Sequence, residues 1–381
     1  MGDTLSQNLR RQRNAAGMTQ AKLADAAGIS RVAYRNIETG SAEPRPETLL
    51  ALARALGVKP PALLVETSPL RAVRFRARKR MRTRDQVLID VQRRLTDYSE
   101  LEDALDDQVP NAFSQVAESL ASREPKAVAA AARRAANLRD DELIRDICGL
   151  LEDKGVKVLP VRLASNDFFG LSVAPNGSGP AIAVNVWERI AVERWIFSAA
   201  HELGHLILHL SEAFDVEQTE ENPSEEKEAD QFASHLLMPD SIFSKEWEEA
   251  RGHSLVDRVL KIKRIFRVSY KTVLYRIQET MPIGGDIWKK FAWEYRQRFG
   301  RTLRFTEEPN GVAADSFSAA IAETLAAAEP EHMARSDFQT DRLARLVRTA
   351  VEEERITLAR GAEILGIPLR EMRQVAASWV A

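Results

Sequence analysis

The segment SAAHELGHLILHL, residues 198–210, places three histidines at intervals of four. Residues four apart lie on one face of a helix, so His201 and His205 are placed to hold one zinc ion between them. Glu202, next to the first histidine, is the residue type that acts as general base at such a site. The alternative is a buried amphipathic helix whose histidines only form hydrogen bonds. The five-residue pattern alone leaves both interpretations open.

A second segment supplies a candidate for the third metal ligand, because a catalytic zinc has three protein ligands and one open position. The run NPSEEKEADQFASHLLMP, residues 222–239, predicts a helix with Asn222 as N-cap and Pro223 in its first position. Glu225 lies three residues after the cap and has a capping role. We therefore predict Glu228, at the edge of the apolar stripe, as third ligand, with Glu225 as the fallback.

His235 lies in the same predicted helix, seven residues after Glu228 and thus two turns along the same face. From that face it could stabilise the tetrahedral intermediate of peptide hydrolysis, so it is a candidate catalytic residue beside Glu202. The alternative is a structural histidine.

The residues before the HELGH segment predict the elements that hold it. Alternating apolar runs separated by glycine and proline predict three short strands within residues 155–163, 168–175 and 179–186. The metal-bearing helix should run from about Arg189 to His209. Strands followed by such a helix suit an α+β zinc-peptidase fold. A substrate segment could add to an edge strand of this sheet near residues 168–187.

Residues 18–58 carry the start and stop signals of short helices. Thr19 is a candidate N-cap, Gly28 suits a left-handed turn, and Ser30 caps a second helix that ends by Gly40. This order predicts a helix-turn-helix. Its core is predicted to be Leu23, Ala27, Ile29, Tyr34, Ile37, Leu49, Leu52 and Leu56.

The charge of the chain is divided unevenly. Over 381 residues the formal net charge is -2, but residues 1–84 hold 17 basic and 6 acidic side chains, and the remainder holds 37 and 50. The N-terminal part therefore suits a polyanion and the rest does not. The length indicates two to three domains, and the single cysteine excludes an internal disulfide framework. With no apolar run long enough for a bilayer, we expect a cytoplasmic protein without membrane contact.

The run RAVRFRARKRMRTR, residues 71–84, has eight basic residues and no acidic one. It is either a solvated charge run or a contact to DNA phosphates beside the helix-turn-helix. The alternation around Val73 and Phe75 would also suit a short strand that docks onto the following domain.

The pattern TQAKLADAAGISRVAYRNIETG, continued by TLLALARALGV, resembles the Xre/Cro-like repressors. In that family the second helix of the motif enters the major groove. The resemblance implies that Arg31 pairs with guanine and Asn36 with adenine, and that Gln20 contacts phosphate. The full set of DNA-binding residues implied is Gln20, Ser30, Arg31, Val32, Ala33 and Asn36.

The segments HELGHLILH and EADQFASHLLMP together resemble the ImmA/IrrE family of bacterial metallopeptidases, over about residues 70–280. The resemblance implies zinc held by His201, His205 and Glu228, with Glu202 polarising the water that attacks a peptide carbonyl. His209 matches a position that the family does not use as a ligand, so we expect a structural role for it.

We expect a mainly α protein with a small α+β part. The predicted parts are a five-helix helix-turn-helix domain at 1–66, a basic and helical connector at 67–150, a zincin-like metallopeptidase domain at 151–280 and a helical region at 281–381. Within the last, Gly366 should separate two helices.

These parts together indicate a transcriptional regulator that binds operator DNA as a homodimer and carries a zinc-dependent endopeptidase. The expected protein substrate is a repressor or the chain itself. Two alternatives remain open: a zinc that is sensory or structural without proteolysis, and an autoregulating regulator of toxin-antitoxin or phage type.

Overall fold

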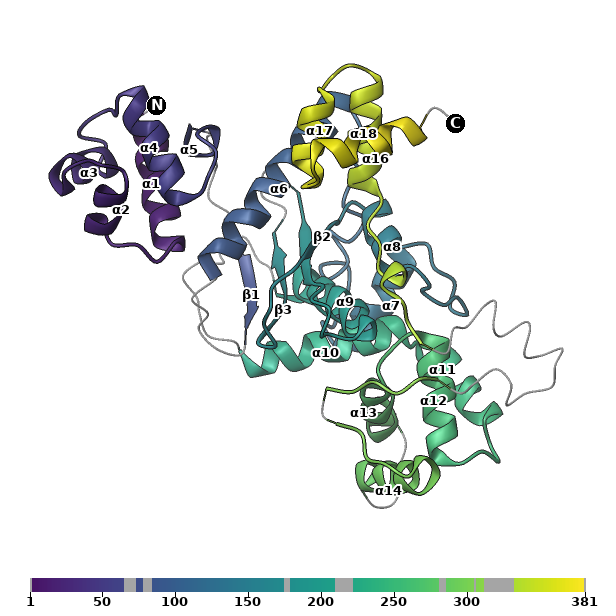
Figure 1. The fold of residues 1–381 in the computed structure, drawn as a ribbon. Coiled ribbons are helices and arrows are strands. Elements are labelled where there is room, and N and C mark those ends of the chain that lie inside the picture. The colour runs from purple at the N-terminus through teal and green to yellow at the C-terminus, as the bar shows by residue number, and fades with distance from the viewer. Residues whose placement is uncertain are drawn as a thin grey trace. The chain divides into compact units, whose positions relative to one another are not determined.

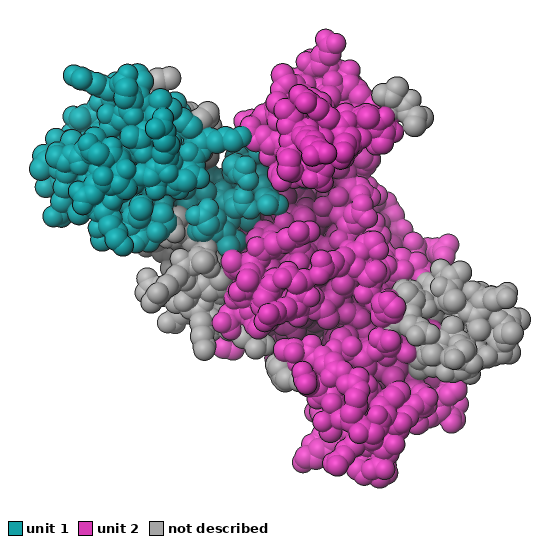
Figure 2. All heavy atoms as spheres, in the orientation of Figure 1, with its two compact units in different colours: residues 1–70, 79–98 teal, residues 71–78, 99–381 magenta. Residues whose placement is uncertain are grey.

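The computed structural model describes residues 2–64, 73–77, 84–174, 179–209, 222–280, 286–304, 306–311 and 332–379. The chain divides into two compact units (Figure 2). Unit 1 consists of residues 1–70 and 79–98, and unit 2 of residues 71–78 and 99–381. None of the helices in the described ranges is both long enough and apolar enough to cross a membrane.

Unit 1 begins with the five helices that the sequence predicts. Thr19 accepts a hydrogen bond from the backbone N–H of Lys22 at 3.2 Å, and Ser30 accepts one from that of Ala33 at 3.1 Å, which confirms both N-caps. Gly28 has a φ of 69°, a left-handed turn conformation that costs glycine little. The helices are α1 (Gly2–Ala15), α2 (Gln20–Ala26), α3 (Arg31–Glu38), α4 (Pro46–Leu56) and α5 (Pro61–Leu64).

The core of unit 1 joins these short helices. Leu23, Tyr34 and Leu52 are fully buried, as predicted, and pack with Leu9 of α1. Burying one leucine side chain stabilises the fold by roughly 1.5–3 kcal/mol, so this cluster is the main stabilising feature of helices too short to be stable alone. Helix α6 (Arg84–Leu105) is divided between the units after Tyr98.

Unit 2 contains a four-stranded sheet with the order β1-β3-β4-β2. Three of its strands confirm the sequence prediction: β2 (Lys157–Val161), β3 (Phe168–Val173) and β4 (Ala181–Asn185). The strand β4 pairs in parallel with β2 and antiparallel with β3. All five residues of β4 are buried, as expected for a central strand covered on both faces.

The fourth strand, β1 (Val73–Ala77), comes from the basic run and pairs antiparallel with β3. Its register sets Arg74 opposite Ser172 and Arg76 opposite Gly170. This confirms that the alternation around Val73 and Phe75 marks a docked strand. The other residues of the run up to 83 lie outside the described residues, so its predicted phosphate contacts stay a prediction.

Helix α9 (Val192–Leu208) packs against β3 and β4 (Figure 1). Helix α10 (Pro223–Leu237) packs against α9 and also against α7 (Pro125–Ala135). The predicted cap of α10 is confirmed, since Asn222 Oδ1 accepts from the backbone N–H of Ser224 at 3.1 Å. The histidine-bearing helix is therefore held between a sheet and a second helix, and its motif lies in the interior.

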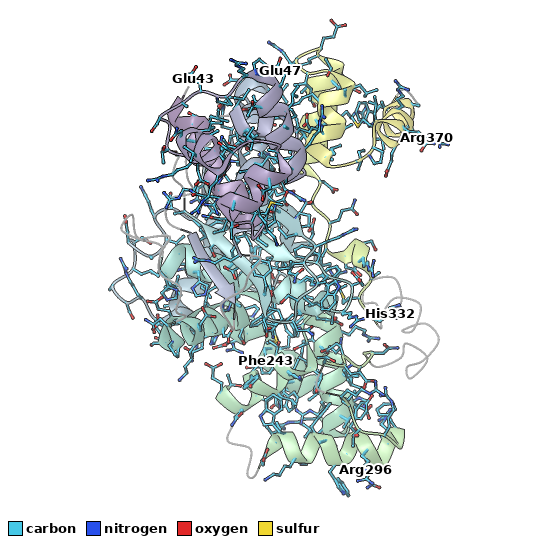
Figure 3. The ribbon with its side chains drawn as sticks, turned by 60° about the vertical axis from the view of Figure 1, so that its left-hand side comes forward. Glu43, Glu47, Phe243, Arg296, His332 and Arg370 are labelled. Atoms are coloured by element: carbon cyan, nitrogen blue, oxygen red, sulfur yellow. The ribbon has the colours of Figure 1, made fainter. Side chains whose placement is uncertain are left out.

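The remaining helices of unit 2 up to residue 299 extend the core around α9 and α10. Phe243, on α11, lies within this core (Figure 3), together with Phe291 and Phe338 from the C-terminal part of the chain. Gly366, with a φ of 66°, separates the last two helices as predicted. The helices are α8 (Ile147–Asp153), α11 (Asp240–Glu249), α12 (Leu255–Phe266), α13 (Tyr270–Thr280), α14 (Ile287–Phe299), the 3-10 turn η2 (Arg335–Asp337), α16 (Arg342–Glu352), α17 (Leu358–Leu365) and α18 (Leu369–Ser378).

Candidate functional site

The HELGH motif lies in the C-terminal half of α9, where His201, Glu202 and His205 have no exposed surface. Burying polar side chains costs free energy unless they form hydrogen bonds or ion pairs. The partners of these three side chains therefore indicate the function of the group. Gly204 lets α10 approach closely, because a Cβ at that position would come within 2.9 Å of the Phe232 ring. The glycine of the motif therefore brings the acidic residues of α10 to the histidines.

The carboxylate that α10 brings to the histidines is that of Glu226. Its two oxygens lie 3.3 Å from His201 Nε2 and 3.1 Å from His205 Nε2, and the two Nε2 atoms are 2.9 Å apart. One ligand atom from each of the three residues lies within 4.8 Å of the others. This donor set of two imidazoles and one carboxylate fits a zinc ion with one position left open.

The structure places Glu226, and not the predicted Glu228, in the group with His201 and His205. The Glu228 carboxylate lies 3.1 Å from His209 Nε2 and is not part of the group, and its side chain is 41% exposed against 16% for Glu226. The fallback, Glu225, accepts a hydrogen bond from the Asn222 side chain at 2.9 Å. Residues two apart on a helix point about 200° away from each other, so Glu226 and Glu228 cannot face the same histidines.

The other nitrogen of each imidazole also has a partner. His201 Nδ1 lies 2.8 Å from an Asp230 carboxylate oxygen, and His205 Nδ1 lies 2.9 Å from His209 Nδ1. Such contacts fix the tautomer and the ring orientation of metal-binding histidines. His209 has the structural role that the sequence predicts for it, and Glu228 supports it from the far side.

Glu202 is held between the histidine helix and the sheet. The Ser172 hydroxyl on β3 donates to its carboxylate and also lies 3.1 Å from its backbone carbonyl. Gly170, two residues before Ser172, leaves the space that the carboxylate occupies, because a Cβ there would lie 2.9 Å from Glu202 Oε1. The carboxylate is therefore fixed beside the histidines and turned towards β3.

The pKa of Glu226 reflects these contacts. Burial alone would raise it, but hydrogen bonds from His201 and His205, together with their charge, hold the pKa of this carboxyl well below its ordinary value. Glu226 is thus an anion in the folded protein, which is the form that binds a metal ion.

The structure does not bring His235 to this group. It lies nine residues beyond Glu226 on α10, its Nδ1 is 3.3 Å from Asp240, and its Nε2 is 2.6 Å from the guanidinium of Arg276. Arg276 is fully buried and also pairs with Asp240 and with Glu279. The ring is engaged in a network of charged side chains between α10, α11 and α13, and its catalytic role stays a prediction.

The sequence prediction missed Glu226 and Ser172, and of these two only Glu226 had a signal. Glu226 lies three residues before Ala229 and seven before Ala233, both of which are buried, so extending that stripe back by one turn would have indicated it. Ser172 gave no signal, because a serine in a strand 30 residues from Glu202 becomes relevant only once the sheet is folded. Among the described residues, the group His201, His205 and Glu226 is the one with metal-binding spacing.

The candidate DNA-binding residues lie on α3 of unit 1. Arg31, Val32, Ala33 and Asn36 are exposed, as is Ser30 at the N-cap, and Val32 leaves 68% of its surface in solvent. An exposed valine beside two hydrogen-bonding side chains suits a surface that contacts thymine methyl groups and base edges.

Gln20, the predicted phosphate contact, is engaged inside unit 1. Its amide donates to Glu38, which also accepts from Arg13 Nε at 2.6 Å and from the Tyr34 hydroxyl at 2.8 Å. Burial would raise the pKa of Glu38, but these hydrogen bonds outweigh it and lower the pKa. The network fixes α2 against α3, and the phosphate contact of Gln20 stays a prediction.

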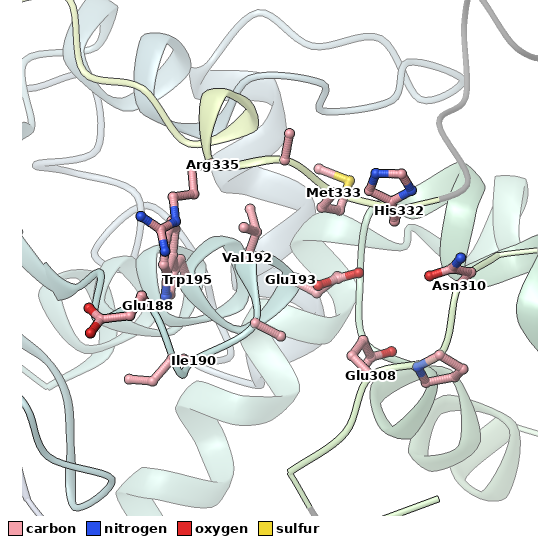
Figure 4. A pocket seen from close by; sticks show the side chains of 13 residues that line it. Glu188, Ile190, Val192, Glu193, Trp195, Glu308, Asn310, His332, Met333 and Arg335 are labelled. Atoms are coloured by element: carbon pink, nitrogen blue, oxygen red, sulfur yellow. The ribbon is translucent and has the colours of Figure 1, made fainter. Parts of the chain in front are cut away.

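A cavity of about 380 Å³ lies at the N-terminal end of α9, and His201, His205 and His209 do not line it (Figure 4). Glu193 and Glu308 line it, and both pair with Lys263, at 2.5 and 3.4 Å. Burial raises the pKa of Glu308 to about 7; Lys263 opposes this rise and Glu193 adds to it.

Glu308 therefore makes stability depend on pH. Because its pKa is higher in the folded protein than the ordinary 4.5, its contribution is complete below about pH 4.5 and is lost as the pH rises through about 7. In Glu308→Gln, which can still accept from the Tyr270 N–H, the unfolding midpoint in urea should fall less between pH 5 and pH 8 than in the parent. Glu188→Gln, at an exposed carboxyl on the same cavity, is the control. Equal pH slopes in all three proteins would show that Glu308 titrates normally.

Comparison with family models agrees with both sites. Residues 9–63 match the helix-turn-helix model, and residues 151–278 match the IrrE N-terminal-like domain of the M78 peptidases. None of the curated proteins compared matches the chain. The chain therefore joins an Xre-like helix-turn-helix domain to an ImmA/IrrE-like peptidase domain.

Proposed function

We propose that this protein is a DNA-binding transcriptional regulator whose second unit is a zinc-dependent endopeptidase that cleaves a repressor-type protein or its own chain. The observation that carries the proposal is the convergence of His201, His205 and Glu226 beside Glu202. A structural zinc site is normally closed by four protein ligands. A set of three beside a fixed carboxylate supports catalysis.

In this proposal His201, His205 and Glu226 hold the ion. When bound there, a zinc ion would supply Lewis acidity toward a water molecule and the carbonyl of the bond to be cut. Glu202 accepts the proton of the attacking water and passes it to the nitrogen of the leaving amine, so that one carboxylate serves as base and then as acid. The Ser172 hydroxyl orients this carboxylate, and Gly170 leaves room for it.

The test compares the parent with Glu202→Gln in an extract of the source organism. Both proteins are loaded with zinc, and new protein N-termini are labelled and identified by mass spectrometry. We expect N-termini that appear with the parent, disappear with chelator and are missing with Glu202→Gln. The same set of N-termini from both proteins would exclude catalysis at this site.

The helix-turn-helix domain is proposed to read operator DNA as a homodimer, with half-sites about one helical turn apart. The exposed face of α3 supports this, since it combines Arg31 and Asn36 with Val32. The N-terminal part is basic and the remainder is acidic, which supports DNA binding by the N-terminal part alone.

Removing the base contact should change specificity more than affinity. Arg31→Ala should cost about 1–3 kcal/mol at one operator position and relax the preference there. Arg10→Ala, which removes the same charge from an exposed site on α1, is the matched control and should leave the preference unchanged. Binding to a randomised operator pool, followed by sequencing, measures both. An identical sequence preference in Arg31→Ala and the parent would reject α3 as the reading helix.

Neutralising Arg78, Lys79 and Arg80 should instead weaken binding to all sequences. Each lost phosphate contact should reduce the slope of log affinity against log salt by about 1. Titrations with operator and with random DNA at several salt concentrations measure this. An unchanged slope would assign the basic run to something other than DNA.

A further inference from the structure

The edge of β3 is the place in unit 2 where an extended peptide would meet the catalytic carboxylate. The Ser172 hydroxyl of β3 donates to the Glu202 carboxylate, and a Cβ added at Gly170 would lie 2.9 Å from Glu202 Oε1. An extended segment that adds to a strand edge forms main-chain hydrogen bonds and sets its carbonyls at regular intervals along that strand. A peptide added to the side of β3 away from β4 would therefore run alongside the two β3 residues that lie against Glu202.

That side is occupied by the chain itself. The strand β1 pairs there in antiparallel register along the length of β3, and positions 74 and 76 lie opposite Ser172 and Gly170. The strand belongs to the basic run that follows the DNA-binding helices in the chain, and it is one of the two edge strands of the sheet.

The burial of the catalytic group agrees with a closed state. His201, Glu202 and His205 have no exposed surface. A protein substrate cannot reach these residues unless an element of the chain moves. A strand at the edge of a sheet, held by one neighbour, is released more easily than a central one.

We propose that residues 73–77 are an internal pseudosubstrate: they occupy the side of β3 to which an extended basic peptide would add, and they keep the peptidase closed until they leave it. The proposal rests on the proposed function, since it takes Glu202 as the base. It assigns an extended segment rich in arginine as the peptide class that this edge accepts. In a second copy of the chain the same residues supply such a segment.

The experiment measures whether freeing the edge creates a binding site. In the full-length Glu202→Gln background without zinc, Arg74→Pro and Phe75→Pro are introduced together. Successive N–H groups of a strand point to opposite sides, so two adjacent prolines must remove one that faces β3. The control is Arg80→Pro with Met81→Pro. It also replaces one arginine and one apolar residue by proline, at positions that follow residues 73–77 in the chain.

The probe is a fluorescent peptide with the sequence LRAVRFRARK, residues 70–79, and its scrambled version. If β1 is docked in nine molecules of ten, it weakens the binding of an added peptide about tenfold. The variant with the two prolines in β1 should therefore bind the probe at least tenfold more tightly than the parent and the control. Amides of β3 should also exchange faster in this variant without peptide. Equal affinities in the three proteins, or equal affinity for the scrambled peptide, would overturn the proposal.

A second variant, in which residues 73–77 become Gly-Ser-Gly-Ser-Gly, separates release of the strand from damage by proline. If both variants lose the cooperative unfolding of unit 2, β1 is a required part of the fold and the proposal is wrong. Restoring Glu202 and adding zinc then tests the proposed function separately. A probe that binds the freed edge but is not cut would leave the docking intact and reject the peptidase.

Discussion

Replacing Glu226 by glutamine should reduce zinc affinity by more than about 100-fold. The amide keeps the size of the side chain but loses the negative charge that a ligand oxygen supplies. Changes in residues that only support metal ligands typically cost about 10–100-fold, so loss of a direct anionic ligand should exceed that range. Competition with a chromophoric chelator measures the affinity.

The matched control is Glu228→Gln, two residues away on the same helix. Glu228 contacts His209, which in turn contacts His205, so its loss should weaken zinc binding by about 10-fold or less. Glu225→Gln should leave affinity unchanged, since that side chain accepts from Asn222 at the helix start. Retained zinc in Glu226→Gln together with lost zinc in Glu228→Gln would restore the sequence-based assignment.

Replacing Glu202 by glutamine should leave zinc bound and slow peptide cleavage by about 10²–10⁴-fold, the usual contribution of a general base. The amide still accepts from Ser172, so the geometry of the site should persist. The rate is measured on the cleavage product that the extract experiment identifies, with zinc content determined on the same samples.

Ser172→Ala separates positioning from catalysis. It removes the hydroxyl that orients Glu202 and should lower the rate less than Glu202→Gln does, without changing zinc content. The assignment of Glu202 as general base would be wrong if Glu202→Gln cleaved at the parent rate with zinc bound, because the metal would then act without this base.

Local patterns in the sequence were sufficient for much of this structure. The caps Thr19 and Ser30, the turn at Gly28 and the three strands before α9 depend on residues close in the chain, and the structure confirms them. The pairing of His201 with His205 follows from the helical repeat alone. Features set within one helix or one turn are therefore predictable from sequence.

Contacts between elements were not predictable to the same degree. Glu226 and Glu228 both lie in the first turns of α10, and the choice between them depends on which face of α10 the close approach at Gly204 turns towards α9. His235 is drawn away by Arg276, which comes from a helix about 40 residues later. Glu226 and Glu228 are two residues, or about 200°, apart on the helix, so the choice between them depends on how α10 is turned against α9.

The position of β1 shows a further limit. Its strand character was visible in the alternation around Val73 and Phe75, but its partner was not. Pairing with β3 spans about 100 residues of sequence and sets the basic run against the strand that contacts Glu202. The proposed closure of the peptidase by β1 depends on that long-range pairing.

The central claim, that His201, His205 and Glu226 form a zinc site beside Glu202, is tested most directly by diffraction from zinc-soaked crystals at the zinc absorption edge. We expect one anomalous peak per chain, at about 2.0–2.2 Å from both Nε2 atoms and from a Glu226 oxygen. A peak between His209 and Glu228, or the lack of any peak near α9 in crystals shown to contain zinc, would contradict the claim.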